Sequence, residues 1–507
     1  MMSSLYIGAV GMIALGDGMQ VVANNLANVN TVGFKERMAL YQDLYNSYQT
    51  APSNNVTNLS QQGHGVKLSA ISTRFYETGA MQAGSDAMDM AISGKGFFKV
   101  SDNGKIAYTR AGNFRFNKEG YLVEPNGYVL NSKTGPIQLN PAQLTMPAKA
   151  TGTAKIVSNL GMGDAMATSA TDPFFSMVGH WSGLNDPPLG EASRGFQDQV
   201  SVYDKNGQSH VLTISYDKVD VTTDGRKIFQ YVIGMNPSED GRADYAGTDG
   251  AGILATGTMT FTASGLLQDM TAYTPTGGGA AVGNLNNWQG IAVGADGIPL
   301  QLTFKTYDAN GLPTGTTTQS LSLNLGMNSA PPSGGGSGTA AAVGTNPANL
   351  PGYTAGASLP VPTNTRDLTT AYAGGSSNQY RTQNGYGQGG LVRLSINTGG
   401  VISGQYSNGQ SLDLFEVPLY RFNGEQDLHA EGSNLFTPTN LSGPAQEGTA
   451  GTENFGSIYG NSLELSNVDM ARQFASMIIT QRGFQFNSKV VTTADTMLQR
   501  AIELKRS

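Results

Sequence analysis

Apolar residues recur every seven positions at both ends of this chain. Near the N-terminus one such row comprises Leu5, Met12, Met19 and Leu26, and a second row comprises Leu15, Val22 and Val29. Near the C-terminus the row comprises Met470, Met477, Phe484, Val491 and Leu498. A seven-residue apolar repeat keeps one side of an α-helix facing a partner helix. We therefore expect a long helix at each end that packs against other helices.

The long central region has the composition of short strands joined by tight turns. Gly accounts for 67 of 507 residues, and charged residues make up 13%, which is about half of the usual share. The net charge of -7 argues against nucleic acid as the main partner, because phosphate binding needs a basic face. The absence of cysteine excludes disulfides and thiolate metal sites.

The two terminal helices have distinct start and stop signals. We expect the first helix at residues 4–30, and it contains Gly8, Gly11, Gly16 and Gly18, each of which weakens a helix by up to ~1 kcal/mol relative to Ala. Such a helix needs packing to persist. We expect the last helix at residues 466–505, beginning with a capping box from Ser466 to Asp469.

Alternating apolar residues predict strands between the helices. We expect strands at residues 97–100, 106–109, 113–116, 121–124, 200–203, 212–216, 302–307, 321–325, 390–397 and 417–422. Residues 36–65 lack a clear period and are interpreted as an extended linker with a short helix near residues 38–48. Residues 275–283 and 331–338 are loops by composition.

This order of elements predicts a mainly β protein with long terminal α-helices and nested, discontinuous domains. The N- and C-terminal helices pair as a coiled-coil-like inner domain, and β-rich domains lie outside it. The expected domains are residues 1–35 with 460–507 (inner helices), 36–65 (linker), 66–150 with 366–459 (first β domain) and 151–365 (outer β insertion of one or two subdomains).

No pattern of catalytic, metal-binding or cofactor-binding residues emerges from the sequence. The four histidines, His64, His180, His210 and His429, are far apart and lack the spacing of metal ligands. Residues 385–390 match Gly-x-Gly-x-x-Gly, but a strand rather than a helix follows, which argues against a dinucleotide site. We expect no cofactor, no metal and no enzymatic activity.

The first residues are apolar enough to resemble a secretory signal, but they lack its positive charge. Lys35 is the first basic residue, and Asp17 is the only charge before it. A cleaved signal needs a positive n-region, so we expect export by a route that keeps the N-terminus. We expect no membrane insertion.

The partner of the terminal helices is expected to be another copy of the chain. Two helices packed only on each other bury little area, and small cores rarely overcome chain entropy. A heterologous contact repeated by a rotation that does not close produces an open helical filament. The heptad rows therefore predict self-assembly.

Several motifs closely resemble those of the bacterial flagellar rod and hook protein family. They are Ala23-Asn-Asn-Leu-Ala-Asn-Val-Asn-Thr-Val-Gly-Phe-Lys35, Met88-Asp-Met-Ala-Ile-Ser-Gly-Lys-Gly-Phe-Phe98, Tyr108-Thr-Arg-Ala-Gly-Asn-Phe114, Ser466-Asn-Val-Asp-Met-Ala471 and Gln481-Arg-Gly-Phe-Gln-Phe-Asn487. The residues that match the family signature are Asn24, Asn25, Asn28, Gly33, Phe34, Lys35, Gly94, Gly96, Phe97, Phe98, Ser466, Asn467, Val468, Gln481 and Arg482. These motifs lie at both ends of the chain in the order expected for the family.

The resemblance implies a structural subunit of the flagellar hook, a curved hollow tube that acts as a flexible joint and transmits motor torque to the filament. It implies a homopolymer whose partners are the distal rod, hook cap and hook–filament junction proteins and the flagellar type III export apparatus. It also implies an extracellular location and export without a cleaved signal peptide.

The same resemblance assigns roles to residues of the helices. The residues expected to pack against neighbouring subunits are Leu5, Met12, Leu15, Met19, Val22, Leu26, Val29, Met470, Phe474, Met477, Phe484, Val491 and Leu498. Gln481, Ser488 and Asp495, on the adjacent row, are candidates for the side that faces the channel.

Two alternatives remain open at this point. The first is a distal rod subunit, because distal rod proteins also carry extra residues in the linker. The second, from a different class, is a secreted β-rich adhesin. An adhesin needs a cluster of binding aromatics, but the only tryptophans, Trp181 and Trp288, are far apart in the sequence.

Overall fold

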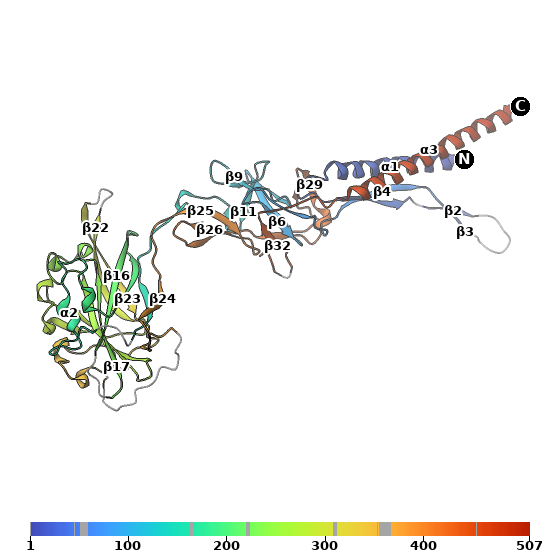
Figure 1. The fold of residues 1–507 in the computed structure, drawn as a ribbon. Coiled ribbons are helices and arrows are strands. Elements are labelled where there is room, and N and C mark those ends of the chain that lie inside the picture. The colour runs from blue at the N-terminus through green and yellow to red at the C-terminus, as the bar shows by residue number, and fades with distance from the viewer. Residues whose placement is uncertain are drawn as a thin grey trace. The chain divides into compact units, whose positions relative to one another are not determined.

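The computed structural model describes residues 2–44, 46–50, 59–161, 166–219, 224–307, 312–351, 353, 367–452 and 454–506 (Figure 1). The chain divides into two compact units. Unit 1 combines Met1–Thr145 with Gly390–Ser507, and unit 2 is the intervening Met146–Gly389. The middle of the chain is therefore inserted into a unit built from both ends, which confirms the nested, mainly β organisation expected from the sequence.

Unit 1 contains the two long helices, α1 (Met2–Ala27) and α3 (Met470–Arg506), which lie side by side (Figure 1). α3 begins later than expected because Asp469, rather than Ser466, caps it. Oδ1 of Asp469 accepts hydrogen bonds from the backbone N–H groups of Ala471 (2.8 Å) and Arg472 (3.2 Å). An aspartate at this position also suits the positive end of the helix dipole.

Glycines line the side of α1 that faces α3. Gly8 and Gly11 are buried, whereas the leucines and methionines of the heptad rows are only half-buried. A Cβ atom added at Gly8 would lie 2.8 Å from Cγ2 of Val491, and one at Gly11 would lie 2.9 Å from Nδ2 of Asn487. The glycines that weaken α1 in isolation therefore allow the two helices to approach closely.

A long antiparallel ribbon follows α1. Its strands are β1 (Arg37–Asp43), paired with β4 (Val66–Thr73), and β2 (Asn46–Thr50), paired with β3 (Leu59–Gly63). The short helix expected near residues 38–48 is therefore wrong. The strands form because β1 pairs with β4 and β2 pairs with β3. In addition, β1 packs on α1, where a Cβ at Gly18 would lie 1.8 Å from the hydroxyl of Tyr41.

The remaining strands of unit 1 form the first β domain, in which segments from the two chain ends pair. An eight-stranded sheet contains β7 (Phe98–Asp102), β8 (Lys105–Thr109), β9 (Arg115–Phe116), β10 (Leu122–Val123), β11 (Val129–Ser132), β12 (Gly135–Pro136), β29 (His429–Gly432) and β30 (Leu435–Thr437). A four-stranded sheet contains β13 (Thr145–Met146), β25 (Gly389–Ile396), β26 (Val401–Tyr406) and β27 (Ser411–Glu416). Three two-stranded pairs are β5 (Met81–Ala83) with β33 (Ser462–Glu464), β6 (Met90–Ser93) with β32 (Ser457–Gly460), and β28 (Leu419–Arg421) with β31 (Gln446–Gly448).

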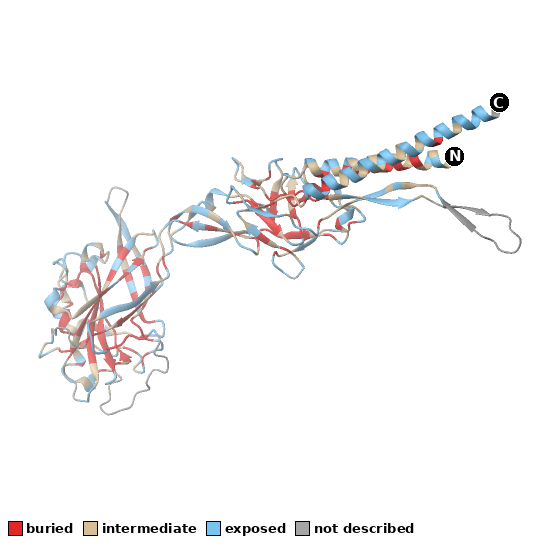
Figure 2. Cartoon of the chain, turned by 45° about the vertical axis from the view of Figure 1, so that its right-hand side comes forward, coloured by how far each residue is buried: buried red, intermediate tan, exposed pale blue. Residues whose placement is uncertain are grey.

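Unit 2 is built mainly from two sheets whose side chains share one core. The seven-stranded sheet contains β15 (Phe196–Tyr203), β16 (Ser209–Val219), β17 (Lys227–Met235), β18 (Ile253–Phe261), β19 (Leu267–Met270), β20 (Tyr273–Pro275) and β21 (Trp288–Gly290). The four-stranded sheet contains β14 (Thr153–Asn159), β22 (Ile298–Tyr307), β23 (Pro313–Asn324) and β24 (Ser377–Gln383). A second apolar cluster, which includes the short helix α2 (Ser176–His180), covers the other face of the larger sheet, so β17 is buried almost throughout (Figure 2).

The boundary of the inserted unit differs from the sequence expectation. The sequence placed residues 366–389 with the first β domain, but β24 pairs along its length with β14 and therefore belongs to unit 2. Six of the seven residues of β24 are exposed, so no apolar alternation marks it as a strand of a core. Its assignment depends on backbone pairing, which leaves no signature in the sequence.

One helix in the described part of the chain has the length and apolarity of a membrane-crossing segment. It spans Ser3–Ala27, has a mean hydropathy of 1.5 in its most apolar window, and is 28% buried in that window. A signal sequence or the core helix of a soluble protein meets the same criterion. Here Gly8 and Gly11 of this helix lie against α3, and among its larger apolar side chains Tyr6 and Ile13 are exposed.

Substitution of Gly8 and Gly11 tests the close approach of α1 and α3. We expect Gly8→Leu and Gly11→Leu each to destabilise the helix pair by about 1–3 kcal/mol, because the added side chain overfills the contact. Gly16→Ala is the matched control: a Cβ there meets nothing within 4 Å, so it should stabilise α1 by up to ~1 kcal/mol. Thermal melting of the helical circular dichroism signal measures both effects. A Gly8→Leu protein that melts at or above the wild-type temperature would contradict the expectation.

Candidate functional site

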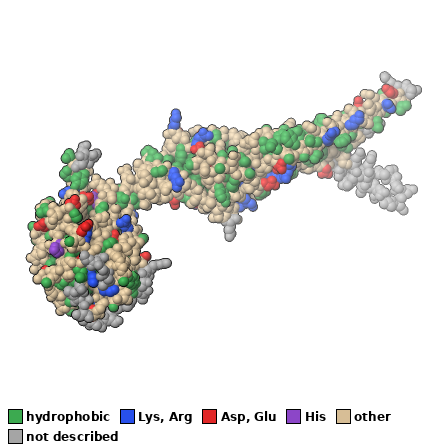
Figure 3. Space-filling model, viewed as in Figure 1, with side chains coloured by type: hydrophobic (Ala, Val, Ile, Leu, Met, Phe, Trp, Pro, Cys, Tyr) green, Lys and Arg blue, Asp and Glu red, His purple; other side chains and the backbone are tan. Residues whose placement is uncertain are grey.

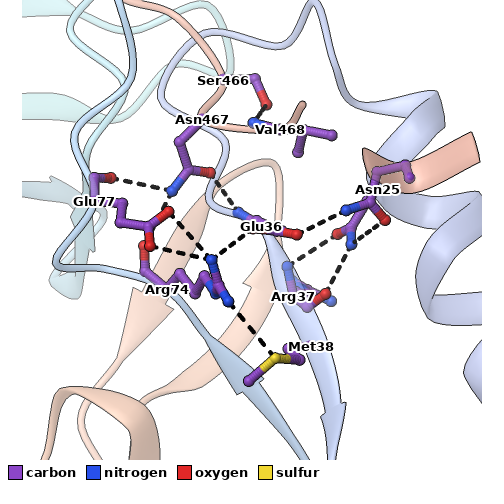
Figure 4. Close-up of polar contacts among 10 residues, drawn as sticks. Asn25, Glu36, Arg37, Met38, Arg74, Glu77, Ser466, Asn467 and Val468 are labelled. Atoms are coloured by element: carbon purple, nitrogen blue, oxygen red, sulfur yellow. Dashed lines mark hydrogen bonds and ion pairs between the residues drawn. The ribbon is translucent and has the colours of Figure 1, made fainter. Parts of the chain in front are cut away.

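The N- and C-terminal signature motifs meet where α1 ends and α3 begins (Figure 4). Asn25, which is buried, bonds to the backbone of β1: its Nδ2 donates to the carbonyl of Arg37 (2.7 Å), and its Oδ1 accepts from the N–H of Arg37 (2.9 Å). Nδ2 of Asn25 also donates to Oε1 of Gln473 on α3 (3.2 Å). One amide therefore connects both helices to the ribbon.

Glu36 extends this network across the junction. Nε2 of Gln473 donates to Oε1 of Glu36 (2.7 Å), and Oε2 of Glu36 lies 3.5 Å from Nη1 of Arg74. The N–H of Glu36 donates to Oδ1 of Asn467 (2.6 Å), whose Nδ2 donates to the carbonyls of Arg74 and Glu77 (Figure 4). The start of α3 is thus held against the residues that follow α1.

A fully buried carboxylate lies beside this network. Oε1 of Glu464 accepts hydrogen bonds from Nζ of Lys35 (2.6 Å) and from the N–H of Gly79 (3.0 Å). Its Oε2 lies 3.3 Å from Nε of Arg110, an ion pair without hydrogen-bond alignment. All three charged side chains are at most 2% exposed. Because a buried charge is costly without a partner, both cations depend on the carboxylate, and the carboxylate depends on the cations.

Burial lowers the pKa values of the two cations. It lowers the pKa of Lys35 to about 8, with the positive charge of Arg110 as the second cause, and Glu464 opposes this shift. Burial also lowers the pKa of Arg110, again opposed by Glu464. The carboxylate therefore keeps both cations charged near neutral pH against the cost of their desolvation.

Two signature glycines shape the pocket of Arg110. Nη1 of Arg110 donates to the carbonyls of Gly94 (2.9 Å) and Gly96 (2.7 Å). These glycines have φ of +103° and +133°, a conformation that other residues adopt only with strain. The turn also inserts Phe97 and Phe98 into the core of the first β domain. Gly33, at φ +69°, likewise adopts a positive φ in the turn after α1, and a Cβ there would meet the backbone of Ala111.

None of the residues expected to pack between subunits is fully buried. The half-buried ones are Leu5, Met12, Leu15, Met19, Val22, Leu26, Val29, Met477, Val491 and Leu498, and the exposed ones are Met470, Phe474 and Phe484. Of the candidates for the channel side, Gln481 and Asp495 are exposed and Ser488 is half-buried. All of them retain surface for a neighbour, and their roles stay predictions.

α3 exposes further apolar side chains that the heptad rows did not predict. They are Ile478, Ile479, Phe486, Val490, Met497 and Ile502, of which Ile479 and Phe486 are each 71% exposed. The helix is exposed over most of its surface (Figure 2), and hydrophobic side chains form patches among polar and basic surface on the visible face of the helix pair (Figure 3). The signal was present in the sequence, since a helix with apolar residues on several sides needs more than one partner.

The polar residues of the junction were not predicted from the sequence. Glu36, Arg110, Glu464 and Gln473 come from four separate segments, and only the fold brings them together. The available signal was the rarity of charge: in a chain with 13% charged residues, a charge next to a signature motif suggests a structural role. The signature residues Asn25, Lys35 and Asn467 are the ones that these side chains contact.

Within the described ranges, no group of three or more His, Asp or Glu side chains could hold a metal ion. His210, the histidine with the closest acidic neighbour, has Nδ1 2.7 Å from Oε2 of Glu239 and stacks on Phe304 with ring centroids 3.8 Å apart. It is 3% exposed and lies in β16. This arrangement suits a packed strand residue.

Four family models match the chain in consecutive segments. They are "Flagella basal body rod protein" at residues 5–35, "Flagellar hook protein FlgE/F/G D1 domain" at 91–161, "Flagellar basal body protein FlaE D2 domain" at 167–386 and "Flagellar basal body rod FlgEFG protein C-terminal" at 460–504. The first and last models cover the signature motifs that meet at the junction. The third lies within unit 2.

Curated relatives match over the full chain. The flagellar hook protein FlgE of Treponema pallidum is 29% identical, with 100% of both chains covered. That of Salmonella typhimurium is 27% identical, with 98% of both chains covered. The Helicobacter pylori FlgE is 45% identical over 124 residues, which are 24% of this chain and 17% of that protein.

Removal of the buried carboxylate charge tests the ion cluster. We expect Glu464→Gln to destabilise unit 1 by about 3–5 kcal/mol, because Lys35 and Arg110 are then buried without a counter-charge. The control is Glu416→Gln, which breaks the half-exposed pair of Glu416 with Lys133 and should cost at most about 1 kcal/mol. Urea unfolding of both variants measures the difference. Equal effects at the two sites would refute the assignment.

The lowered pKa of Lys35 predicts a pH dependence of stability. The folded pKa of Lys35, about 8, lies below the ordinary lysine pKa of 10.5, so the unfolded chain binds more protons between these pH values. The contribution of Lys35 to the unfolding free energy therefore rises with pH through that window. Between pH 7.5 and 9.5 the wild type should gain about 1–2 kcal/mol relative to Lys35→Met. Urea unfolding at both pH values measures the difference in unfolding free energy between the two proteins. If this difference is the same at both pH values, the pKa of Lys35 is not lowered in the folded state.

Proposed function

Because this chain belongs to the flagellar hook protein family, we propose that its copies polymerise through the exposed faces of α1 and α3 into the curved hollow tube of the hook. The chain is a structural subunit and not an enzyme. The tube acts as a flexible joint that transmits motor torque to the filament. The distal rod subunit is the weaker alternative, since the full-length relatives described above are hook proteins, and the adhesin is not favoured.

The observation that carries this proposal is the apolar surface of α3. Soluble monomers rarely leave a continuous apolar surface of this kind uncovered, and large exposed patches mark interaction sites. In α3, Phe474, Ile478 and Phe486 are exposed although their helix already contacts α1. Burial of each such side chain against a neighbour contributes about 1.5–3 kcal/mol.

The charges of the two helices favour contact between α1 of one copy and α3 of the next. α1 carries a single charged residue, Asp17. α3 carries a basic excess, with Arg472, Arg482, Lys489, Arg500, Lys505 and Arg506 against Asp495 and Glu503. Like-charged α3 helices repel one another, whereas a contact with α1 does not incur this cost. Such a contact joins different surfaces and therefore continues without closing.

In this proposal the layers of the polymer have different mechanical roles. The helices hold the inner tube, with Gln481, Ser488 and Asp495 toward the channel and the heptad rows toward neighbouring helices. The ion cluster of Glu464 and the network of Asn25 transmit force from the helices to the first β domain. Unit 2, which has polar and glycine-rich surfaces, forms the outer layer, where wet polar contacts permit sliding as the tube bends.

The proposal includes the position of the subunit in the flagellum. The polymer is extracellular and lies between the distal rod and the hook–filament junction proteins, and it grows beneath the hook cap. The subunit leaves through the flagellar type III export apparatus with its N-terminus uncleaved and without insertion into a membrane.

Assembly of purified protein tests the proposed function. We expect the wild type to form curved tubes under polymerising conditions, visible by electron microscopy, and Ile478→Asp to remain monomeric with unchanged melting temperature. Ile478 is 58% exposed, so the charge costs nothing in the monomer but is buried in the polymer. The control is Leu184→Asp in unit 2, which is 64% exposed and should still assemble. Straight rods would favour the alternative, and tubes formed by Ile478→Asp would exclude α3 as the assembly surface.

A further inference from the structure

A polar pocket of about 490 Å³ lies in unit 1 at the end of α1. We call it the amide pocket because its lining includes the side chains of Asn24, Asn28, Asn113, Asn126 and Asn434. Four segments converge there: the end of α1 with the turn after it, the loop after β8, the β10–β11 turn and the β29–β30 turn. Nδ2 of Asn434 donates to the carbonyl of Val32 (2.8 Å) and so fixes one wall of the pocket.

One family-signature residue lies at this pocket with few contacts inside the monomer. Asn25 faces inward and organises the junction, but Asn24 is exposed, and among the described residues its side chain meets only Nδ2 of Asn28, at 3.5 Å. The amide of Asn28 is engaged at both ends, since its Nδ2 donates to the backbone carbonyl of Asn24 (2.9 Å) and its Oδ1 accepts from the hydroxyl of Thr31 (3.1 Å). The amide group of Asn24 therefore remains available to something outside the monomer.

The pocket also contains two opposite charges that are not paired with each other. Glu124 is 2% exposed, and in the described structure its carboxylate accepts one long hydrogen bond, from Nδ2 of Asn126 (3.3 Å). Burial raises the pKa of this carboxyl group. The guanidinium of Arg37 forms no ion pair with any described residue. The bonds between Arg37 and Asn25 use the backbone of Arg37 and leave its side chain uninvolved. A buried carboxyl group with so few partners is costly unless a ligand supplies more hydrogen bonds.

We propose that the amide pocket receives a polar segment of a second copy of this chain and acts as a specific contact within the polymer. The segment presents a hydrogen-bond donor or a cation to Glu124 and an acceptor or an anion to Arg37. This inference rests on the proposed function, since it requires polymerisation.

The position of the pocket supports a second copy as the occupant. The exposed side of α1 includes Tyr6, Ile13 and Gln20, which are seven residues apart, and continues to Asn24 at the pocket. A neighbour that packs along the exposed side of α1 therefore reaches the pocket at its end. The apolar side chains on this side of α1, such as Tyr6 and Ile13, supply affinity for a neighbour. They do little to fix the position of that neighbour along the helix, because similar side chains recur at regular spacing. Paired amides and charges supply the register.

Cysteine labelling tests whether the pocket is occupied in the polymer. The chain contains no cysteine, so Asn126→Cys introduces a single thiol at an exposed position of the pocket rim. We expect a maleimide to label it at least about tenfold more slowly in the polymer than in the monomer, because the docked segment covers it. Lys205→Cys, on an exposed turn of unit 2, is the control for access of the reagent. A photoactivatable maleimide at position 126, followed by peptide mass spectrometry, identifies the segment of the neighbour.

Charge variants test the chemistry of the contact. Arg37→Gln should raise the critical concentration for polymerisation about tenfold, whereas Arg37→Lys, which keeps the charge, should remain close to wild type. Glu124→Gln should weaken assembly without lowering the monomer melting temperature. These results, together with protection of position 126, would support the proposal.

The outcomes separate this inference from the proposed function. If tubes form but position 126 labels equally fast in tube and monomer, the pocket contact is wrong and the hook function stands. If position 126 is already unreactive in the dilute monomer, some occupant other than a second copy fills the pocket, and the inference is again wrong. If the wild-type chain forms no polymer, both proposals fail together.

Discussion

The fold of unit 1 depends on one buried carboxylate that holds segments from opposite ends of the chain. Glu464 lies just before the C-terminal helix, Lys35 lies just after the N-terminal helix, and Arg110 belongs to the first β domain. Because all three charges are buried, the two cations depend on the carboxylate as their counter-charge, and the carboxylate depends on the cations. The cluster therefore makes the pairing of the helices and the folding of the β domain interdependent. In a subunit that transmits torque, it is a rigid connection where a flexible linker would lose force.

In the two helices, small residues form the contact within one molecule, and large side chains remain exposed for contacts with other molecules. Gly8 and Gly11 lie against α3, and Gly483 of α3 lies against Leu15, so the helices of one molecule approach closely. The large side chains, such as Phe474 and Ile479, remain exposed and available to other molecules. A helix pair that packed through its leucines and methionines would be more stable alone and less able to assemble. The monomer is thus arranged for a contact that it cannot make by itself.

The polar residues near the amide pocket show the same division between contacts inside the monomer and groups available to a neighbour. Of the adjacent signature residues, Asn25 organises the interior of the monomer, while Asn24 and Asn28 line the pocket with Glu124 and Arg37. Apolar surfaces supply most of the free energy of association, and paired polar groups fix its register. In a polymer whose subunits must bend past one another, a few specific contacts at the inner layers can hold the register while the outer layers move.

The sequence by itself determined the terminal helices, the β-rich middle, the nested order and the family, because heptad rows, alternating strands and signature motifs are local patterns. It also included Gly33, Gly94 and Gly96 among the residues of recognisable motifs, and the structure shows these glycines with positive φ. Only the tertiary structure decided which side of α1 faces α3, that β1 pairs with β4 and β2 with β3 where a short helix was expected near residues 38–48, and that β24 belongs to unit 2. The same is true of the partnership of Lys35, Arg110 and Glu464. These features depend on contacts between segments that are separated in the sequence, by tens of residues within the ribbon and by 429 residues between Lys35 and Glu464, and the residues of each segment alone do not specify the partner.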